Sequence, residues 1–272
     1  MRYQDGDPLA SAPGALARLR AGEPVLSLGI RVSRTTDIVR MAAGAGYGVV
    51  WIDLEHSAMP IDCAAQMAAT AADLGLAGWV RIPEREYGVV GRLLDGGASG
   101  IIAPKLETAE EAALIAAACR FPPAGQRSMI ATLPQMGFVR MATPLLARAA
   151  DDAIALQVLL ESAKGIANVD AIAAVDGVDI LGVGMNDLTA DLGCPGNPGH
   201  PDVAAALNAV VSAARRHGKI AVVGGLGDAG KFVDAVASGF APLIFAGIDT
   251  DILSGGLAGR AAEWRERFPA TA

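Results

Sequence analysis

The chain has 272 residues, of which 52% are hydrophobic and 4% aromatic, and its formal net charge is −7. This length allows a large buried core, and 33 glycines suit tight turns between short strands. The net negative charge argues against binding to the phosphate backbone of a nucleic acid, so we expect no nucleic-acid partner. No apolar run approaches the length of a membrane-spanning helix, so we expect no membrane segment either.

The cysteines and the start of the chain bear on its location. Cys63, Cys119 and Cys194 lie far apart and form neither a Cys-x-x-Cys pair nor a zinc-binding spacing. We interpret them as thiols of a reducing compartment. The polar stretch from Met1 to Pro8 lacks the apolar core of a secretory signal. These observations predict a cytoplasmic protein.

Short apolar segments alternate with Ala-rich helical segments along the whole chain. Eight segments are predicted strands: 25–30, 49–53, 78–82, 100–104, 154–160, 178–184, 220–223 and 242–245. The predicted helices are 35–45, 60–74, 86–97, 108–119, 163–175, 201–217, 228–238 and 251–268. Strands this apolar are typical of parallel sheets covered on both faces. The pattern predicts one α/β domain over 1–272, a single (β/α)8 TIM barrel, with an open doubly wound sheet as the alternative.

Two segments stand outside the regular alternation. Residues 121–150 are rich in Pro and Gly, and we expect an irregular loop there that has a function or contacts a partner. The last helix, over 251–269, carries an apolar stripe that includes Leu257 and Trp264. This helix either packs on its own barrel or is exchanged onto a neighbouring subunit.

Charged residues cluster where the predicted strands end. They are Asp53, Glu55, His56, Arg81, Lys105, Glu161 and Asp187. Because the carboxyl ends of barrel strands meet at one rim, we expect these side chains to share a site. Glu161 and Asp187 follow neighbouring strands, and two such carboxylates can hold a hard divalent cation with positions left for substrate and water.

Five motifs carry a family resemblance. They are Trp51-Ile52-Asp53-Leu54-Glu55-His56, Val80-Arg81-Ile82-Pro83, Leu93-Leu94-Asp95-Gly96-Gly97-Ala98, Glu161-Ser162-Ala163-Lys164-Gly165 and Asp187-Leu188-Thr189. In their order and spacing, from about Gly29 to Gly247, the chain resembles the HpcH/HpaI aldolase and citrate lyase family.

The resemblance implies a metal-dependent (class II) aldolase on a barrel of the phosphoenolpyruvate/pyruvate type. Such a lyase reversibly cleaves a 4-hydroxy-2-oxo acid to pyruvate, or a pyruvate-like 2-oxo acid, and an aldehyde through a stabilised enolate. Glu161 and Asp187 would bind Mg²⁺, Mn²⁺ or Co²⁺. Backbone N–H groups near Asn186 and Asp187 would receive the substrate carboxylate.

The resemblance also implies roles for three charged residues and a histidine. Arg81 would hold the keto oxygen and stabilise the enolate. His56, oriented by Asp95, would move protons, since a histidine titrates near neutrality. Arg127 would lie near the mouth of the active site and contact the substrate. Family members exchange their last helix within dimers that build hexamers, which implies a homo-oligomer here.

Several alternatives remain open at this point. One is an acyl-CoA lyase of the citrate-lyase beta type, and another is a non-catalytic barrel that binds a keto acid. Lys105 at a strand end could form a Schiff base, although Glu107 nearby favours its charged form. The run 225–231 resembles a phosphate-binding loop, but Phe232 stands where that loop needs Ser or Thr. Leu159 replaces a family glutamine, which affects substrate identity more than metal binding.

Overall fold

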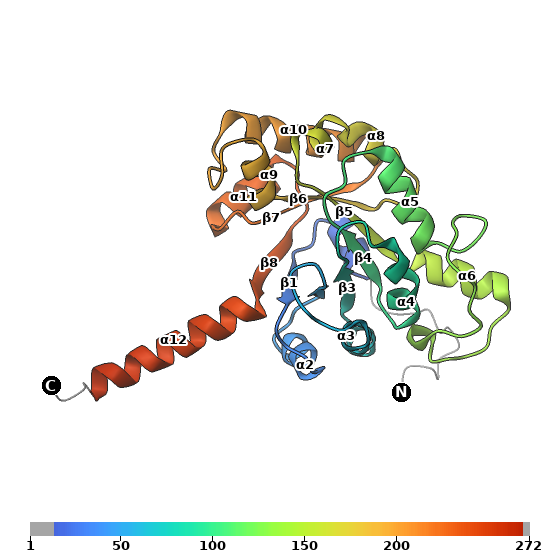
Figure 1. Ribbon diagram of the computed structural model, residues 1–272, viewed down its shortest axis with the longest axis horizontal. Helices are drawn as coiled ribbons and strands as arrows, with labels where there is room; N and C mark the ends of the chain where they lie inside the picture. Colours follow the sequence, from blue (N-terminus) through green and yellow to red (C-terminus); the bar gives the residue numbers. More distant parts are fainter. Residues whose placement is uncertain (1–13, 269–272) are drawn as a thin grey trace.

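The computed structural model describes residues 14–268, which form one parallel eight-stranded sheet surrounded by helices (Figure 1). Residues 1–13 and 269–272, and with them Met1–Pro8 and the ends of the predicted domain, lie outside the described residues. The strands are β1 (Val25–Ile30), β2 (Val49–Asp53), β3 (Ala77–Arg81), β4 (Gly100–Ala103), β5 (Ala155–Leu160), β6 (Ile180–Gly184), β7 (Ile220–Gly224) and β8 (Leu243–Ile248).

The strands curl into a nearly closed barrel. Their order is β7-β6-β5-β4-β3-β2-β1-β8, and every pairing is parallel. β8 pairs with β1, so among the described strands only β7 and β8 face each other without a hydrogen-bonded ladder. This arrangement confirms the predicted (β/α)8 barrel and excludes the open doubly wound sheet.

The helices follow the predicted alternation with some additions. They are α1 (Ala15–Arg20), α2 (Asp37–Gly44), α3 (Ile61–Asp73), α4 (Val90–Asp95), α5 (Ala109–Cys119), α6 (Thr143–Asp152), α7 (Ala163–Ala167), α8 (Val169–Ala173), α9 (Met185–Asp191), α10 (Pro201–His217), α11 (Ala229–Ser238) and α12 (Asp249–Arg267), with 3₁₀ turns at Tyr87–Val89 and Pro134–Met136. Within residues 14–268, no helix has both the length and the apolar character needed to cross a membrane.

Helix α6 corrects the expectation that 121–150 is irregular throughout. Pro144 lies in the first turn of α6, where the missing N–H leaves no intrahelical bond unmade. Leu146 is buried in a small cluster with Phe121 and Leu133. Tertiary burial therefore stabilises a helix in a segment whose Pro and Gly content indicated a loop.

Small residues bring the helices close to the barrel wall. A Cβ at Gly78 of β3 would lie 2.8 Å from the Cα of Ala68 in α3, which is closer than real contacts allow. Ala64, Ala68 and Ala71 of α3 are fully buried. The Ala-rich composition of the helices therefore reflects close helix–sheet packing, which keeps the strands in register and their carboxyl ends at one rim.

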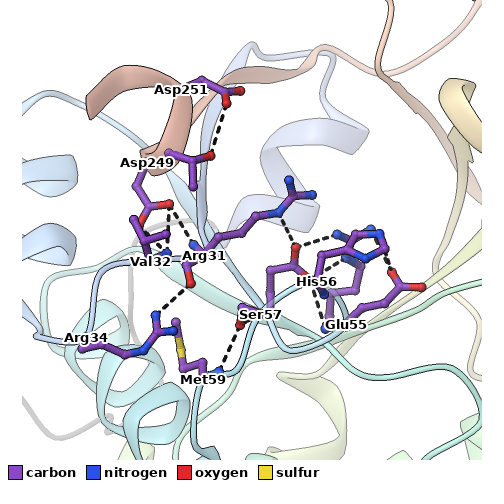
Figure 2. Close-up of polar contacts among 12 residues, drawn as sticks. Arg31, Val32, Arg34, Glu55, His56, Ser57, Met59, Asp249 and Asp251 are labelled. Atoms are coloured by element: carbon purple, nitrogen blue, oxygen red, sulfur yellow. Dashed lines mark hydrogen bonds and ion pairs between the residues drawn. The ribbon is translucent and has the colours of Figure 1, made fainter. Parts of the chain in front are cut away.

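A buried carboxylate ties the end of β8 to the loop that follows β1. Asp249 is 1% exposed and accepts hydrogen bonds from the backbone N–H groups of Arg31 (2.8 Å), Val32 (3.1 Å) and Ser33 (2.8 Å), as Figure 2 shows. Burial alone would raise the pKa of Asp249, but these N–H groups outweigh it and hold the pKa below its ordinary value.

We predict that Asp249→Asn lowers the free energy of unfolding by about 1.5–3 kcal/mol at pH 7, because the amide presents donors to backbone donors. The folded-state pKa of Asp249 is lowered, so its contribution is complete above the unfolded pKa of about 4 and disappears as pH falls through the folded value. Urea unfolding of both proteins between pH 3 and pH 7 measures this difference. Asp251→Asn, at an exposed position, is the control. Equal stability of Asp249→Asn and wild type at pH 7 would contradict the assignment.

Candidate active site

A cavity of about 660 Å³ opens at the carboxyl ends of the strands. Residues that follow β1, β2, β3, β5 and β6 line it, namely Arg31, His56, Arg81, Glu161, Asn186 and Asp187. The cavity lies at the rim where barrel strands present their functional side chains. Five residues with a predicted role in the site therefore line one cavity, and Arg31 is an addition. The five are His56, Arg81, Glu161, Asn186 and Asp187.

Glu161 is held in place at the end of β5. It is 6% exposed, and its Oε2 accepts the backbone N–H of Lys105 at 3.0 Å. β6 presents Gly184 beside it, and a Cβ at that position would collide with Glu161 Oε1. Gly182 likewise makes room for Gln157 of β5, since a Cβ there would lie 2.6 Å from Gln157 Nε2. The Gly-x-Gly of β6 thus allows polar side chains from β5 to turn into the barrel.

The environment of Glu161 disfavours its ionised form. Burial raises the pKa of Glu161 to about 7, and the charges of Asp187 and Glu55 act in the same direction. The Lys105 N–H and Arg81 oppose this shift without cancelling it. Glu161 is therefore a buried carboxylate in the field of other acids, and a bound cation would offset this negative charge.

The donor set fits a hard divalent cation. Glu161 and Asp187 supply carboxylate oxygens, the ligands that such ions prefer. Residues 14–268 contain no group of three or more His, Cys, Asp or Glu side chains arranged to hold a metal ion. An ion bound by Glu161 and Asp187 would therefore keep most of its coordination positions for water and substrate.

Arg81 at the end of β3 is fixed by two acids. Its Nε and Nη2 donate to Asp53 at 3.0 Å and 2.6 Å, and its Nη1 lies 3.0 Å from Glu55 Oε2. Its guanidinium also lies 5.2 Å from the centre of the Trp51 ring. Burial would raise the pKa of Asp53, but Arg81 and Arg31 hold it below its ordinary value. The guanidinium therefore stays charged and oriented in the cavity wall.

His56 lies at the rim beside Glu55. Its Nε2 is 3.7 Å from Glu55 Oε2, and its backbone N–H donates to Asp53 Oδ1 at 3.2 Å (Figure 2). About half of its side chain is exposed to the cavity and solvent. Glu55 is the carboxylate that the structure places beside the His56 imidazole within this chain.

Within the single chain, Asp95 lies apart from the cavity that His56 lines, and its pairing with His56 stays a prediction. Asp95 is the last residue of α4 and accepts a 2.7 Å hydrogen bond from Arg127. The helices of a barrel run opposite to its strands, so the last turn of α4 lies at the end remote from the cavity.

Arg127 does not line the cavity of the single chain, and its predicted contact with the substrate stays a prediction. It lies just beyond α5, where its backbone N–H donates to the carbonyl of Arg120. It is 3% exposed, and its guanidinium lies 4.3 Å from the centre of the Phe121 ring. Within a single chain, the buried Arg127 guanidinium forms an ion pair with the partly exposed Asp95 at the remote end of the barrel.

Three residues of the site escaped the sequence analysis. Arg31 directly follows the predicted strand 25–30, so the rule that identified Arg81 would have found it. Gln157 lies two residues before the Leu159 position and is buried in the cavity wall. Asp249 was missed because the predicted strand 242–245 ended before the true end of β8.

Comparisons with known proteins agree with this architecture. The family model described as HpcH/HpaI aldolase/citrate lyase matches residues 31–252. A 4-hydroxy-4-methyl-2-oxoglutarate aldolase of Hapsidospora irregularis is 41% identical over 210 residues, which cover 76% of this chain and 77% of the relative. A hydroxypyruvate/pyruvate aldolase of Pseudomonas aeruginosa is 34% identical and covers 75% of each chain.

A solved structure extends the likeness to three dimensions. The HpcH/HpaI aldolase of Desulfitobacterium hafniense superposes with a TM-score of 0.86 at 30% identity and covers 96% of this chain and 100% of its own. The family model spans every residue that lines the cavity, from Arg31 to Asp251. The chain therefore belongs to the HpcH/HpaI aldolase/citrate lyase family.

Proposed function

We propose that this chain is a divalent-metal-dependent aldolase. It cleaves a 4-hydroxy-2-oxo acid to pyruvate, or a closely related 2-oxo acid, and an aldehyde, and it catalyses the reverse addition. The observation that carries the proposal is the pair Glu161 and Asp187 in one cavity with the fixed guanidinium of Arg81. Relatives named as aldolases of 2-oxo acids support it.

Glu161 and Asp187 would hold Mg²⁺, Mn²⁺ or Co²⁺, and the bound ion would act as a Lewis acid that stabilises negative charge on the keto oxygen. Arg81 donates hydrogen bonds to that oxygen, because Asp53 and Glu55 hold its guanidinium at the cavity wall. Backbone N–H groups near Asn186 and Asp187 receive the substrate carboxylate.

His56 is the proton-transfer group in this proposal. As the bond between C3 and C4 breaks, His56 accepts the proton of the C4 hydroxyl, directly or through a water molecule. Glu55 Oε2 lies 3.7 Å from Nε2 of this imidazole. A cytoplasmic location, the role of Asn186 and the identity of the metal stay predictions from the sequence.

Chelation tests the metal requirement. We predict that dialysis against EDTA abolishes aldol cleavage and that Mn²⁺ or Co²⁺ restores it, because the Glu161 pocket otherwise concentrates negative charge near the developing enolate. Initial rates of pyruvate release measure both steps. Full activity in EDTA, together with borohydride trapping of a substrate adduct at Lys105, would instead assign Schiff-base chemistry. Lys105 is half exposed, and its Nζ lies 3.7 Å from Glu84.

The two carboxylates can be tested by metal binding as well as by turnover. We expect Glu161→Gln and Asp187→Asn each to remove measurable Mn²⁺ binding in isothermal titration calorimetry and to lower kcat/KM by about 10³-fold or more. Asp202→Asn removes an exposed acid outside the cavity and is the matched control. Undiminished Mn²⁺ affinity in both cavity variants would refute the ligand assignment.

We further propose that the chain is a homo-oligomer of dimers that build a hexamer and exchange α12. Figure 1 shows α12 projecting away from the barrel. Its apolar side chains are exposed, including Ile252 at 50%, Leu257 at 71% and Trp264 at 56%. A stripe of this kind on a projecting helix is typical of a subunit contact.

Truncation tests this contact. Removing residues 256–272 keeps Asp249 and the start of α12, and we expect it to convert an oligomer into single chains, as measured by light scattering after gel filtration. Arg260→Gln, a polar change on the exposed surface of the same helix, leaves the oligomer intact. A wild-type mass of one 27.6 kDa chain would contradict the proposal.

A further inference from the structure

The two arginines of the cavity differ in how far the protein satisfies their donors. Arg81 donates through Nε and Nη2 to Asp53, and its Nη1 pairs with Glu55. Arg31 donates only through Nε, to Asp53 at 2.6 Å. Within residues 14–268, its Nη1 and Nη2 have no hydrogen-bond partner, although the guanidinium is only partly exposed. A guanidinium that keeps its outer edge free can bind a carboxylate with two parallel hydrogen bonds.

The loop that carries Arg31 is held in place by hydrogen bonds. Asp249 binds the backbone N–H groups of Arg31 and its two following residues. Figure 2 shows the Arg31 side chain reaching from this loop toward the end of β2, where Glu55 and His56 lie. The bond to Asp53 and the Trp51 ring, whose centre is 6.0 Å from the guanidinium carbon, limit its rotation. A binding group fixed in this way loses little conformational entropy when it meets a ligand.

The position of Arg31 relative to Glu161 and Asp187 decides which part of a substrate it can meet. β2, β3 and β4 stand between β1 and β5 in the sheet, so Arg31 and Glu161 face each other across the mouth of the barrel. A substrate with its 2-oxo acid end at Glu161 and Asp187 directs its other end toward Arg31. Asp251, which also lines the cavity, accepts from Thr250 Oγ1 at 3.2 Å and leaves Arg31 free.

We propose that Arg31 is a specificity-determining residue that binds a carboxylate on the fragment released as the carbonyl product. The substrates it favours are 4-hydroxy-2-oxo dicarboxylic acids over their monocarboxylic analogues. This inference rests on the aldolase function proposed above. Arg31 takes no part in proton transfer. When the C3–C4 bond breaks, the proton of the C4 hydroxyl goes to His56, and Arg31 binds the carboxylate of the departing fragment.

The test uses two substrates that differ only at the distal end, 4-hydroxy-2-oxoglutarate and 4-hydroxy-2-oxopentanoate, in the Mn²⁺-loaded enzyme. The measured quantity is the ratio of their kcat/KM values, so intrinsic reactivity cancels between enzyme variants. In the wild type this ratio, dicarboxylate over monocarboxylate, should favour the dicarboxylate. We expect Arg31→Met to reduce the ratio by about 10- to 100-fold. Arg31→Lys keeps the charge but not the planar fork, so it should lower the ratio less.

The matched control is Arg34→Met. Arg34 lies three residues further along the same loop, is exposed, and donates to the backbone carbonyls of Arg31 and Ser33 rather than into the cavity. Removing its charge changes the local field by a similar amount, yet the ratio should stay at the wild-type value. A ratio that falls equally in Arg34→Met and Arg31→Met would overturn a direct contact.

Exchange of the pyruvate methyl protons in deuterium oxide, followed by NMR, separates the other outcomes because it needs no aldehyde. If Arg31→Met lowers this exchange and both cleavage rates by the same factor, Arg31 acts through Asp53 on Arg81, and the specificity role is wrong. Unchanged ratios in both Arg31 variants would likewise refute it. If wild type shows neither exchange nor cleavage, the aldolase proposal itself has failed, and the Arg31 proposal with it.

Discussion

The burial of the Glu161 carboxylate beside further acids is the constraint on which the rest of the cavity depends. Desolvation and a second carboxylate raise the pKa of Glu161 to about 7, although a backbone N–H binds its Oε2. A pocket arranged only for stability would not keep two acids at this cost. The glycine at position 184 leaves the space that keeps Glu161 turned inward. A cation between the two acids would turn this unfavourable arrangement into a stable one.

A second principle is that the two arginines of the cavity are held by acids behind them. Asp53 binds both Arg31 and Arg81, and Glu55 lies against Arg81 and His56. These contacts orient the donors before a substrate arrives, so little reorganisation is needed when charge develops. Asp249 extends the support by fixing the loop that carries Arg31, which links the closure of the barrel to the geometry of the site.

The barrel was predictable because its strands are apolar on both faces and bounded by turn residues. The predicted bounds 25–30 and 49–53 coincide with β1 and β2. Helix α6 was not predictable from the sequence, because the burial of Leu146 against Phe121 outweighs the local Pro and Gly residues that favour a loop. Glu161 and Asp187 were found together since both follow a strand. The role of Asp95 was implied by the family resemblance, and within the single chain the direction of α4 places Asp95 at the end remote from the cavity.

The central claim is that Glu161 and Asp187 share one metal ion in contact with the reacting oxygen. A crystal structure with Mn²⁺ and oxalate, a mimic of the pyruvate enolate, tests it most directly. We predict an anomalous scattering peak coordinated by both carboxylates, with oxalate on the ion and one oxalate oxygen accepting from Arg81. A peak bound elsewhere, or oxalate in the cavity with Glu161 and Asp187 not coordinating any ion, would contradict the claim.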